Sequence, residues 1–352
     1  MLTAGACGPG WRGPEPPVTV VPAARRGQGG VTDLPIHLQW TFRHRAYLGA
    51  HPVPVGPQLG MVDMQGRVLF VDPNTGKLTE DLKVKGSLGT PLAWDEQRFY
   101  TVAAHPRRRL SAFSFKGGKR LWDRDFNDPP KRPIRLVEDL LVTSGGALYA
   151  LDPVSGTTRD VLYDGPATWL APVLWADDVM LLGRGGQAIV LDSSGTVRWE
   201  ADVDAFCEFA PAVQGDATYV STTDGQVISL DMQGTELWRR QLDSTSLYTP
   251  RFAGDALIVA AVGGALWSLD AVTGGTRWTR TLSGPVAGAP HCDARWIGVT
   301  TVDGGLWLLD PGSGQVTDSV ILDALIHESP VWAFGRLLVT SNKTLYAYGT
   351  SP

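Results

Sequence analysis

Histidine is the side chain best suited to bind a transition metal or to transfer a proton near neutral pH, and this 352-residue chain has six. No histidine stands at a metal-ligand spacing from a second ligand, although His44 and His51 share one predicted loop and leave a metal site there as an alternative. Gly-x-Ser-x-Gly, His-Glu-x-x-His and P-loop motifs are also missing. We therefore predict no enzyme, with no catalytic, cofactor-binding or metal-binding residues. The six histidines are His37, His44, His51, His105, His291 and His327.

Six aspartates precede a turn glycine at equivalent places in the chain. Carboxylates that recur in this way could bind a metal or act in catalysis. An aspartate at this position can also accept hydrogen bonds from backbone N–H groups two residues further on, so we interpret the six as turn caps. Glycine pairs such as Gly145-Gly146 could cradle a phosphate, but they recur as hairpin turns and none leads into a helix. The six are Asp72, Asp152, Asp192, Asp231, Asp270 and Asp310.

The aspartate turns belong to a repeat of about 40 residues, which prolines mark at the same step. Within one unit, residues 211–242, four short runs of β-forming residues are separated by Gly, Asp and Gln turns, a pattern typical of an antiparallel meander. Such a sheet has two apolar faces, and radial stacking of copies buries both, so the repeat predicts a β-propeller. The prolines are Pro52, Pro91, Pro133, Pro172, Pro211, Pro250, Pro290 and Pro330.

Tryptophan recurs four residues after the turn glycine in four of the units. We predict that each indole wedges between neighbouring blades and donates its N–H to a backbone carbonyl, although an indole stripe could instead bind a ligand. Other units place Glu80, Asp160 or Asp318 at this position. The four are Trp122, Trp199, Trp238 and Trp278.

The unit count predicts how the ring closes. Seven complete units precede a last one that lacks its outermost strand, and the segment 36–42 has the outer-strand pattern with Trp40 at the wedge position. We therefore predict an all-β, eight-bladed propeller of four-stranded antiparallel blades, spanning residues 36–352. Strand 36–42 closes the ring by pairing with the segment 344–349 of the C-terminal blade.

Residues 1–35 differ in composition and are predicted to be a flexible Gly/Pro-rich leader or tether. Ala4-Gly5-Ala6-Cys7 resembles the processing site of bacterial lipoproteins, in which the cysteine is acylated. The basic and apolar segments that precede such a site are not in the sequence, so a chance match stays open. No apolar run of 18 residues occurs. Cys207 and Cys292 fall in different units, and we expect no disulfide between them.

Charge is distributed unevenly along the chain. Residues 36–135 hold 17 Lys/Arg against 9 Asp/Glu, whereas residues 136–352 hold 11 against 25. In a four-stranded blade, the loop between the second and third strands lies on the same face as the loop to the next blade. The basic loops would then converge on one rim and bind a protein partner, with ordinary solvated loops as the alternative. The candidate rim residues are Arg43, Arg45, Arg107, Arg108, Arg109, Lys131, Arg132 and Arg135.

The repeated Leu-Asp-x-x-Thr/Ser-Gly-x-x-x-Trp pattern resembles that of the pyrroloquinoline-quinone-like propeller family over nearly all of residues 36–352. The family includes quinone-dependent dehydrogenases, sensor domains and assembly scaffolds, so the resemblance implies a fold more than a function. Its quinone enzymes carry a calcium-binding Glu/Asn/Asp set, a catalytic Asp and an adjacent cysteine pair. The three cysteines of this chain are not adjacent.

Compact loops, a flexible leader and Cys7 are similar to features of the propeller lipoproteins of the bacterial outer-membrane barrel-assembly machinery. That resemblance implies a non-enzymatic, monomeric scaffold without a cofactor, located in the periplasm or cell envelope, which binds a protein partner and touches the membrane only through a lipid anchor. Nucleic acid is disfavoured because most of the chain is acidic. The alternatives are a ligand-binding or sensory propeller, a degenerate quinoprotein dehydrogenase and a cytoplasmic location.

The missing ligand set leads to a first prediction. We expect no tight binding of pyrroloquinoline quinone with calcium, because the set of residues that holds this pair in the quinone enzymes is not in the sequence. Calorimetric titration measures the affinity. A dissociation constant of about 1 μM or below would return the dehydrogenase hypothesis to first place.

Overall fold

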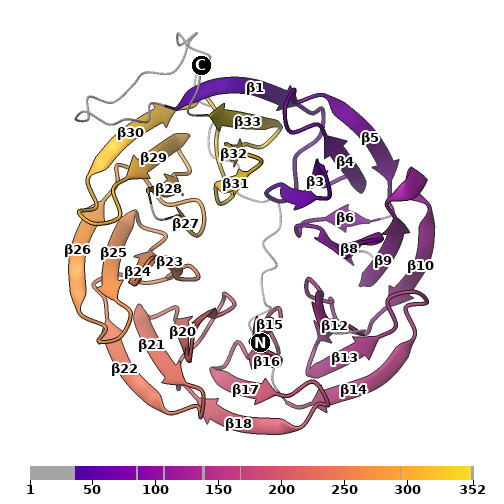
Figure 1. The fold of residues 1–352 in the computed structure, drawn as a ribbon, viewed down its shortest axis with the longest axis horizontal. Helices are drawn as coiled ribbons and strands as arrows, with labels where there is room; N and C mark the ends of the chain where they lie inside the picture. The colour runs from indigo at the N-terminus through magenta and orange to yellow at the C-terminus, as the bar shows by residue number, and fades with distance from the viewer. Residues whose placement is uncertain are drawn as a thin grey trace, which may run out of the picture.

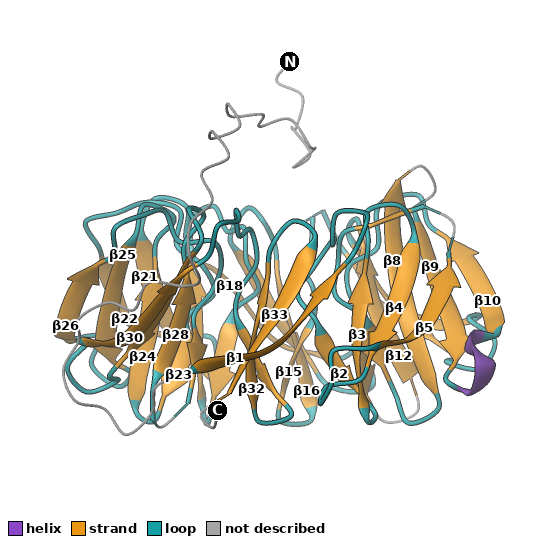
Figure 2. Cartoon of the chain, turned by 90° about the horizontal axis from the view of Figure 1, so that it is seen from above, coloured by secondary structure: helices purple, strands orange, loops and turns teal. Residues whose placement is uncertain are grey.

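Eight antiparallel sheets surround a central axis, as Figure 1 shows in a view along that axis. The computed structural model describes residues 36–84, 86–105, 108–136, 139–166, 168–293 and 295–349. Figure 2 shows the ring edge-on, with the strands of every blade running between its two faces. The predicted eight-bladed, all-β propeller is confirmed. Within the described residues the helical element is the single turn η1 (Lys116–Gly118), so this part of the chain contains no helix that could span a membrane.

In the first half of the ring, the strands of each blade follow the chain from the axis outward. Blade 1 contains β2 (Val53–Val55), β3 (Gln58–Val62), β4 (Arg67–Val71) and β5 (Leu78–Lys83). Blade 2 contains β6 (Ser87–Leu88) and β7 (Ala93–Trp94), then β8 (Arg98–His105), β9 (Arg109–Ser114) and β10 (Arg120–Asp125). Blade 3 contains β11 (Ile134–Leu136), β12 (Asp139–Ser144), β13 (Ala147–Leu151) and β14 (Thr158–Asp164). Blade 4 contains β15 (Val173–Trp175), β16 (Asp178–Leu182), β17 (Gln187–Leu191) and β18 (Val197–Asp202).

The second half of the ring repeats this order. Blade 5 contains β19 (Ala212–Gln214), β20 (Ala217–Ser221), β21 (Gln226–Asp231) and β22 (Glu236–Gln241). Blade 6 contains β23 (Arg251–Ala253), β24 (Ala256–Ala260), β25 (Ala265–Asp270) and β26 (Thr276–Thr281). Blade 7 contains β27 (His291–Cys292), β28 (Ile297–Thr300), β29 (Gly305–Leu309) and β30 (Val316–Ile321). Blade 8 contains β31 (Val331–Ala333), β32 (Arg336–Thr340), β33 (Thr344–Gly349) and, outermost, β1 (His37–Arg43).

Seven of the eight repeat prolines stand immediately before the innermost strand of their blade. Blade 2 departs from this rule, because Pro91 falls inside the inner edge and divides it into β6 and β7. Both pieces pair with the unusually long β8. Proline has no backbone N–H to donate to a ladder, which explains its place at the end of the innermost strand and the interruption in blade 2.

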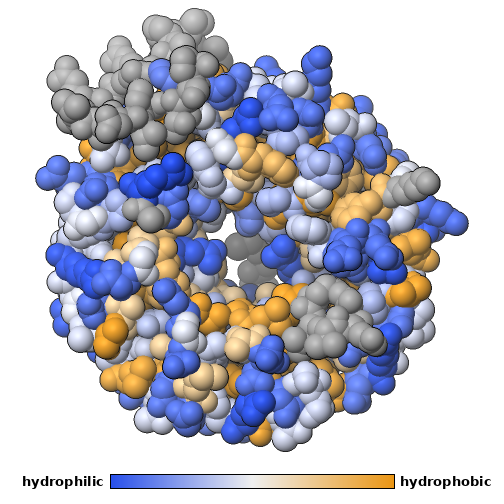
Figure 3. Space-filling model, viewed as in Figure 1, coloured by the Kyte–Doolittle hydropathy of each residue, from blue (hydrophilic) through white to orange (hydrophobic). Residues whose placement is uncertain are grey.

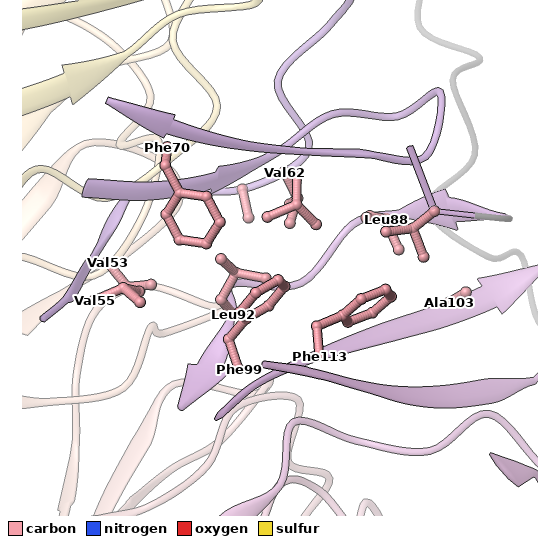
Figure 4. Close-up of a cluster of buried hydrophobic side chains, with 12 residues drawn as sticks. Val53, Val55, Val62, Phe70, Leu88, Leu92, Phe99, Ala103 and Phe113 are labelled. Atoms are coloured by element: carbon pink, nitrogen blue, oxygen red, sulfur yellow. The ribbon is translucent and has the colours of Figure 1, made fainter. Parts of the chain in front are cut away.

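The hydrophobic core lies in the seams between blades, because both faces of each sheet are apolar. Between blades 1 and 2, Phe70 meets Phe99 edge-on at 5.2 Å, and Phe99 stacks on Phe113 at 5.1 Å (Figure 4). The same cluster includes Val62 from blade 1 and Leu88 from blade 2. Comparable clusters follow around the ring, so neighbouring blades are joined mainly by buried apolar surface.

Closure joins the two ends of the described chain. Strand β1 pairs antiparallel with β33, with His37 opposite Gly349 and Arg43 opposite Thr344. Trp40 donates its indole N–H to the carbonyl of Pro73 in blade 1 at 3.0 Å. The prediction for segments 36–42 and 344–349 is therefore confirmed, including the wedge position of Trp40. Residues 1–35, which include Cys7, lie outside the described residues.

The predicted turn and wedge roles are also confirmed. Asp72 Oδ1 accepts the backbone N–H groups of Asn74 and Thr75 at 2.9 and 2.8 Å, and the other five aspartates bond their turns in the same manner. Three more indoles donate to a carbonyl of the next blade. Trp199 is the exception: its buried N–H has no hydrogen-bond partner among the residues that the structure describes. The turn that it faces, 231–234, is one residue shorter than those facing its counterparts.

A β-bulge lies one residue before the wedge position in all eight outer strands. In β18, for example, Trp199 pairs with Val190 and Val197 with Leu191, which leaves one residue between them unpaired. A bulge increases the local twist and redirects the next side chain. It aims each wedge residue into its seam, which the sequence pattern did not predict.

The two faces of the ring differ in their loops. We call the face with the inter-blade loops and the loops between second and third strands the loop face, which is the upper side in Figure 2. Here backbone hydrogen bonds and isolated bridges, such as Leu48↔Asp63, Leu247↔Ala261 and Ile326↔Ser341, tie each blade to the next. The opposite turn face carries the aspartate turns. Figure 3 shows that hydrophilic and hydrophobic residues are mixed on this turn face, around an opening on the axis.

Ring closure leads to a second prediction. Deleting residues 1–45 removes β1 and Trp40, leaves the outer edge of β33 unpaired, and is expected to abolish cooperative unfolding near the wild-type temperature. Deleting residues 1–34 keeps β1 and its pairing with β33, and should change the unfolding free energy by less than about 0.5 kcal/mol. Circular dichroism during thermal and urea unfolding measures both. Wild-type stability in the longer deletion would contradict the role of β1 in closure.

Candidate protein-interaction surface

The loops with the predicted rim residues all lie on the loop face, but the structure separates these residues into three neighbourhoods. The first is at the end of the outer strand of blade 8, the second at the connection between β8 and β9 in blade 2, and the third before the inner strand of blade 3. Two of the eight predicted residues give no side-chain geometry: Arg107 lies outside the described residues, and only the backbone of Arg135 is described, as part of β11.

The first neighbourhood contains Arg43, Arg45 and Tyr47. The in–out alternation of β1 continues past its last residue, so these three side chains are exposed while His44 between them is buried. Tyr47 is 53% exposed, and Lys343 places its ammonium group 5.0 Å above the tyrosine ring. Cations beside an exposed aromatic ring form a surface typical of protein recognition.

The second neighbourhood contains Arg108 and Arg109. Arg108 is exposed and donates to the carbonyl of Asn127. Arg109 is only 11% exposed and donates to both carboxylate oxygens of Asp125, at 2.5 and 2.8 Å, and to Asp123 at 3.0 Å. The bond to Asp125 raises the pKa of Arg109. Arg109 therefore links β9 to β10 within blade 2, and its guanidinium group is already paired with two carboxylates.

The third neighbourhood contains Lys131 and Arg132 next to the central channel. Arg132 donates two hydrogen bonds, of 3.1 and 2.9 Å, to the carbonyl of Leu92 in blade 2, and burial lowers its pKa. Burial also lowers the pKa of Lys131, and the positive charge of Arg184 adds to this effect. A cavity of about 240 Å³ lies beside Arg132, lined also by Trp94, Tyr100 and Leu174 among others. It is smaller than the roughly 300–1,000 Å³ of typical small-molecule sites.

Three residues of the loop face were not predicted from the sequence: Tyr47, Lys343 and Arg184. Tyr47 could have been found by extending the alternation of β1 beyond its last residue. Lys343 could have been found from the predicted pairing of segments 36–42 and 344–349, which places it next to the end of β1. Arg184 could not, because only the packing between blades brings it beside Lys131. Acidic residues occupy the same face further around the ring, in the loops after blades 4 and 5: Asp202, Asp204, Glu208 and Asp243.

Residues that could hold calcium or a quinone do not converge in the described structure. His44 bonds the buried Asp63 at 2.8 Å, and His51 bonds Glu328 at 3.2 Å, so the two histidines of the predicted loop have separate partners. In the described part of the chain, no three His, Cys, Asp or Glu side chains form a group that could bind a metal. Cys207 and Cys292 are both free thiols, as expected, and burial raises the pKa of each to about 12. These residues do not fit a quinone–calcium pair.

The fold and the repeat define a pyrroloquinoline-quinone-like β-propeller. The family model described as outer membrane protein assembly factor BamB matches residues 37–173, 162–250 and 233–338, and the chain therefore belongs to this family. Among solved structures, BamB from Moraxella catarrhalis is similar, with a TM-score of 0.75 at 17% identity over 89% of this chain and 99% of that chain. The computationally designed Ika8 protein is also similar, with a TM-score of 0.77 at 12% identity over 88% and 99%. Identities this low show a shared fold and nothing further. No curated protein matches the chain.

The contrast between two neighbouring arginines leads to a third prediction. Replacing Arg109 with serine removes a bidentate ion pair in a partly buried site and should lower the unfolding free energy by about 1–2 kcal/mol. Replacing the exposed Arg108 should change it by less than about 0.5 kcal/mol. Urea unfolding of both variants gives the difference. Equal unfolding free energies of the two variants would mean that the ion pairs of Arg109 do not contribute to stability.

Proposed function

We propose that this protein is a non-enzymatic scaffold of the bacterial cell envelope that binds a protein partner during outer-membrane protein assembly. The observation that carries the proposal is the family match, which extends over residues 37–338 and so covers nearly the whole propeller. A fold can host many functions, so the proposal also needs a surface suited to a partner.

The loop face supplies this surface. Its inter-blade loops are held by backbone hydrogen bonds to the blades on both sides, such as those of Leu48 with Asn342 and of Gly49 with Val62, so the side chains on it are presented from a rigid frame. Its charge is divided, with Arg43, Arg45 and Lys343 on one side and acidic loops such as that of Asp202 and Asp204 further around the ring. Charges divided in this way orient an approaching partner and speed its encounter.

The neighbourhood of Tyr47 is the best candidate for the centre of the contact. Tyrosine and arginine are enriched among the residues that dominate binding energy at protein interfaces. Here an exposed tyrosine is flanked by Arg45 and Lys343, and the buried pair of His44 with Asp63 fixes the segment beneath it. Ala4-Gly5-Ala6-Cys7 supports an acylated cysteine as the membrane tether, which would place the propeller in the periplasm.

The test is affinity capture of the tagged protein from solubilised bacterial envelopes, followed by mass spectrometry. We expect an outer-membrane assembly component with the wild-type chain and less of it with the combined Arg43→Ser, Arg45→Ser and Lys343→Ser variant, because that variant removes three cations from the loop face. The matched control removes Arg159, Arg277 and Arg295, three arginines toward the turn face.

Two results would count against the proposal. Failure of the wild-type chain to capture any assembly component would overturn the scaffold function. Equal capture by the loop-face variant and the control would leave the function but reject the loop face as its site. Mass analysis of the mature N-terminus is an independent check on Cys7, since an unmodified N-terminus would exclude the lipid anchor.

A further inference from the structure

Most seams of this ring are filled in the same way. In five of them a tryptophan from the outer strand of one blade lies against the turn glycine of the next, so closely that a Cβ on Gly314 would come within 2.5 Å of the Trp278 ring. Four of these indoles also donate a hydrogen bond across the seam. The indole thus fills the outer part of the seam from one blade to the other.

Three seams have no tryptophan at this outer-strand position, and two of them are closed there by other means. Between blades 3 and 4, the backbone and side chain of Leu162 lie against Gly195. Between blades 7 and 8, the buried Asp318 accepts the backbone N–H of Ile36 at 2.9 Å. Between blades 1 and 2, Glu80 stands in register with the tryptophans. The side chain of Leu82 lies against Gly118, as Leu162 does against Gly195, but this seam still contains a cavity.

This seam between blades 1 and 2 contains a cavity of about 360 Å³. That volume is within the range of sites that hold a small molecule or a large side chain. Its apolar walls are the buried Val84 and Phe113, the latter labelled in Figure 4 beside Phe99. Its polar lining consists of Lys83, Arg109, Ser111, Arg120 and Asp123, with Gly118 completing the wall.

A single carboxylate organises the polar side of the cavity. Asp123 accepts hydrogen bonds from Ser111 at 2.8 Å, from Arg109 at 3.0 Å and from Arg120 at 3.1 Å. Arg109 is further held by Asp125. The lining thus contains three cations and one carboxylate, whereas Glu80 of the same seam is not part of the lining. Two of the cations, Lys83 and Arg120, are exposed at the mouth. The mouth therefore carries excess positive charge, while the interior is partly apolar.

We infer that this cavity binds a partner protein by accepting an aromatic side chain that has an acidic residue close to it in sequence. The aromatic ring would occupy the part of the seam that indoles fill elsewhere in this ring, against Val84 and Phe113. The carboxylate would pair with Lys83 and Arg120 at the mouth. The inference concerns a site that the proposed function leaves open, and its test needs no assembly component.

A protein side chain fits these observations better than a free anion does. The polar groups at the back of the cavity already satisfy each other through Asp123, which leaves no converging donors for a fully enclosed phosphate or carboxylate. The excess charge lies at the mouth, where a segment running over the surface would place its acidic residue. The equivalent seams show that an aromatic ring can fill such a space in this propeller.

The test uses a synthetic peptide, N-acetyl-Asp-Gly-fluorotryptophan-Gly-Asp-amide, titrated with the full chain and followed by fluorine NMR. We expect a dissociation constant of about 1 mM or tighter. A peptide with lysine in place of both aspartates should bind at least about ten-fold more weakly. Added salt should weaken binding of the acidic peptide, because the mouth charges are exposed.

Two variants locate the binding site. Glu80→Trp with Leu82→Arg copies the pair Trp278 and Arg280 of blade 6, fills the seam, and should weaken peptide binding by about ten-fold or more. Lys83→Ser with Arg120→Ser keeps the apolar walls and removes the mouth charges, with the same expected loss. Lys77→Ser with Arg277→Ser, which removes two cations outside this seam, is the matched control and should bind like the wild type.

The outcomes separate the possible occupants. Unchanged peptide binding by a folded seam-filling variant overturns the inference, and unchanged binding by the charge variant does so even if the filled variant fails to fold. Binding of N-acetyl-tryptophan or benzoate as tight as that of the peptide would identify a small-molecule site instead. Dimerisation at high concentration that the seam-filling variant abolishes would identify a second copy of the chain as the occupant.

Discussion

The pairing of β1 with β33 brings together residues from the two ends of the described chain, with His37 opposite Gly349. A ring of sheets is stable only if every blade has a neighbour on both sides, since otherwise two apolar faces are exposed to water. Blade 8 can act as that neighbour only when β1 supplies its outer strand and Trp40 enters the seam to blade 1. The packing of all the other blades depends on this one junction between the ends of the chain.

Once the ring is closed, the seams differ in how completely side chains fill the space between neighbouring blades. Indoles aimed by the bulges fill five seams, and substitutes close two more. The seam between blades 1 and 2 differs on both sides, because Glu80 replaces tryptophan in blade 1 and the inner edge of blade 2 is interrupted at Pro91. The irregular part of the ring is thus also the basic part, where a charged loop face and a lined cavity lie close together.

The side chains of the loop face can vary because the fold depends there mainly on backbone hydrogen bonds. Its bridges between blades are made by backbone atoms, so residues such as Tyr47 and Val262 can project outward without affecting closure. The turn face is more constrained, since its aspartates bond their own turns and its glycines must accommodate an indole. This division suits a scaffold, in which one constant frame presents a surface that can change with the partner.

The sequence by itself determined the repeat, the blade count, the closing strand and the roles of Asp72 and Trp278, because each of these follows from local spacing within a repeat of about 40 residues. The tertiary structure alone decided the rest. Arg109 and Arg132 belong to the predicted rim by sequence, yet one pairs with Asp123 and Asp125 and the other bonds Leu92. The placement of Arg184 beside Lys131 and the open seam beside Lys83 likewise depend on residues far apart in the chain. Periodicity specifies which residues are equivalent, whereas a charge or a cavity at one place depends on how neighbouring, non-equivalent blades meet.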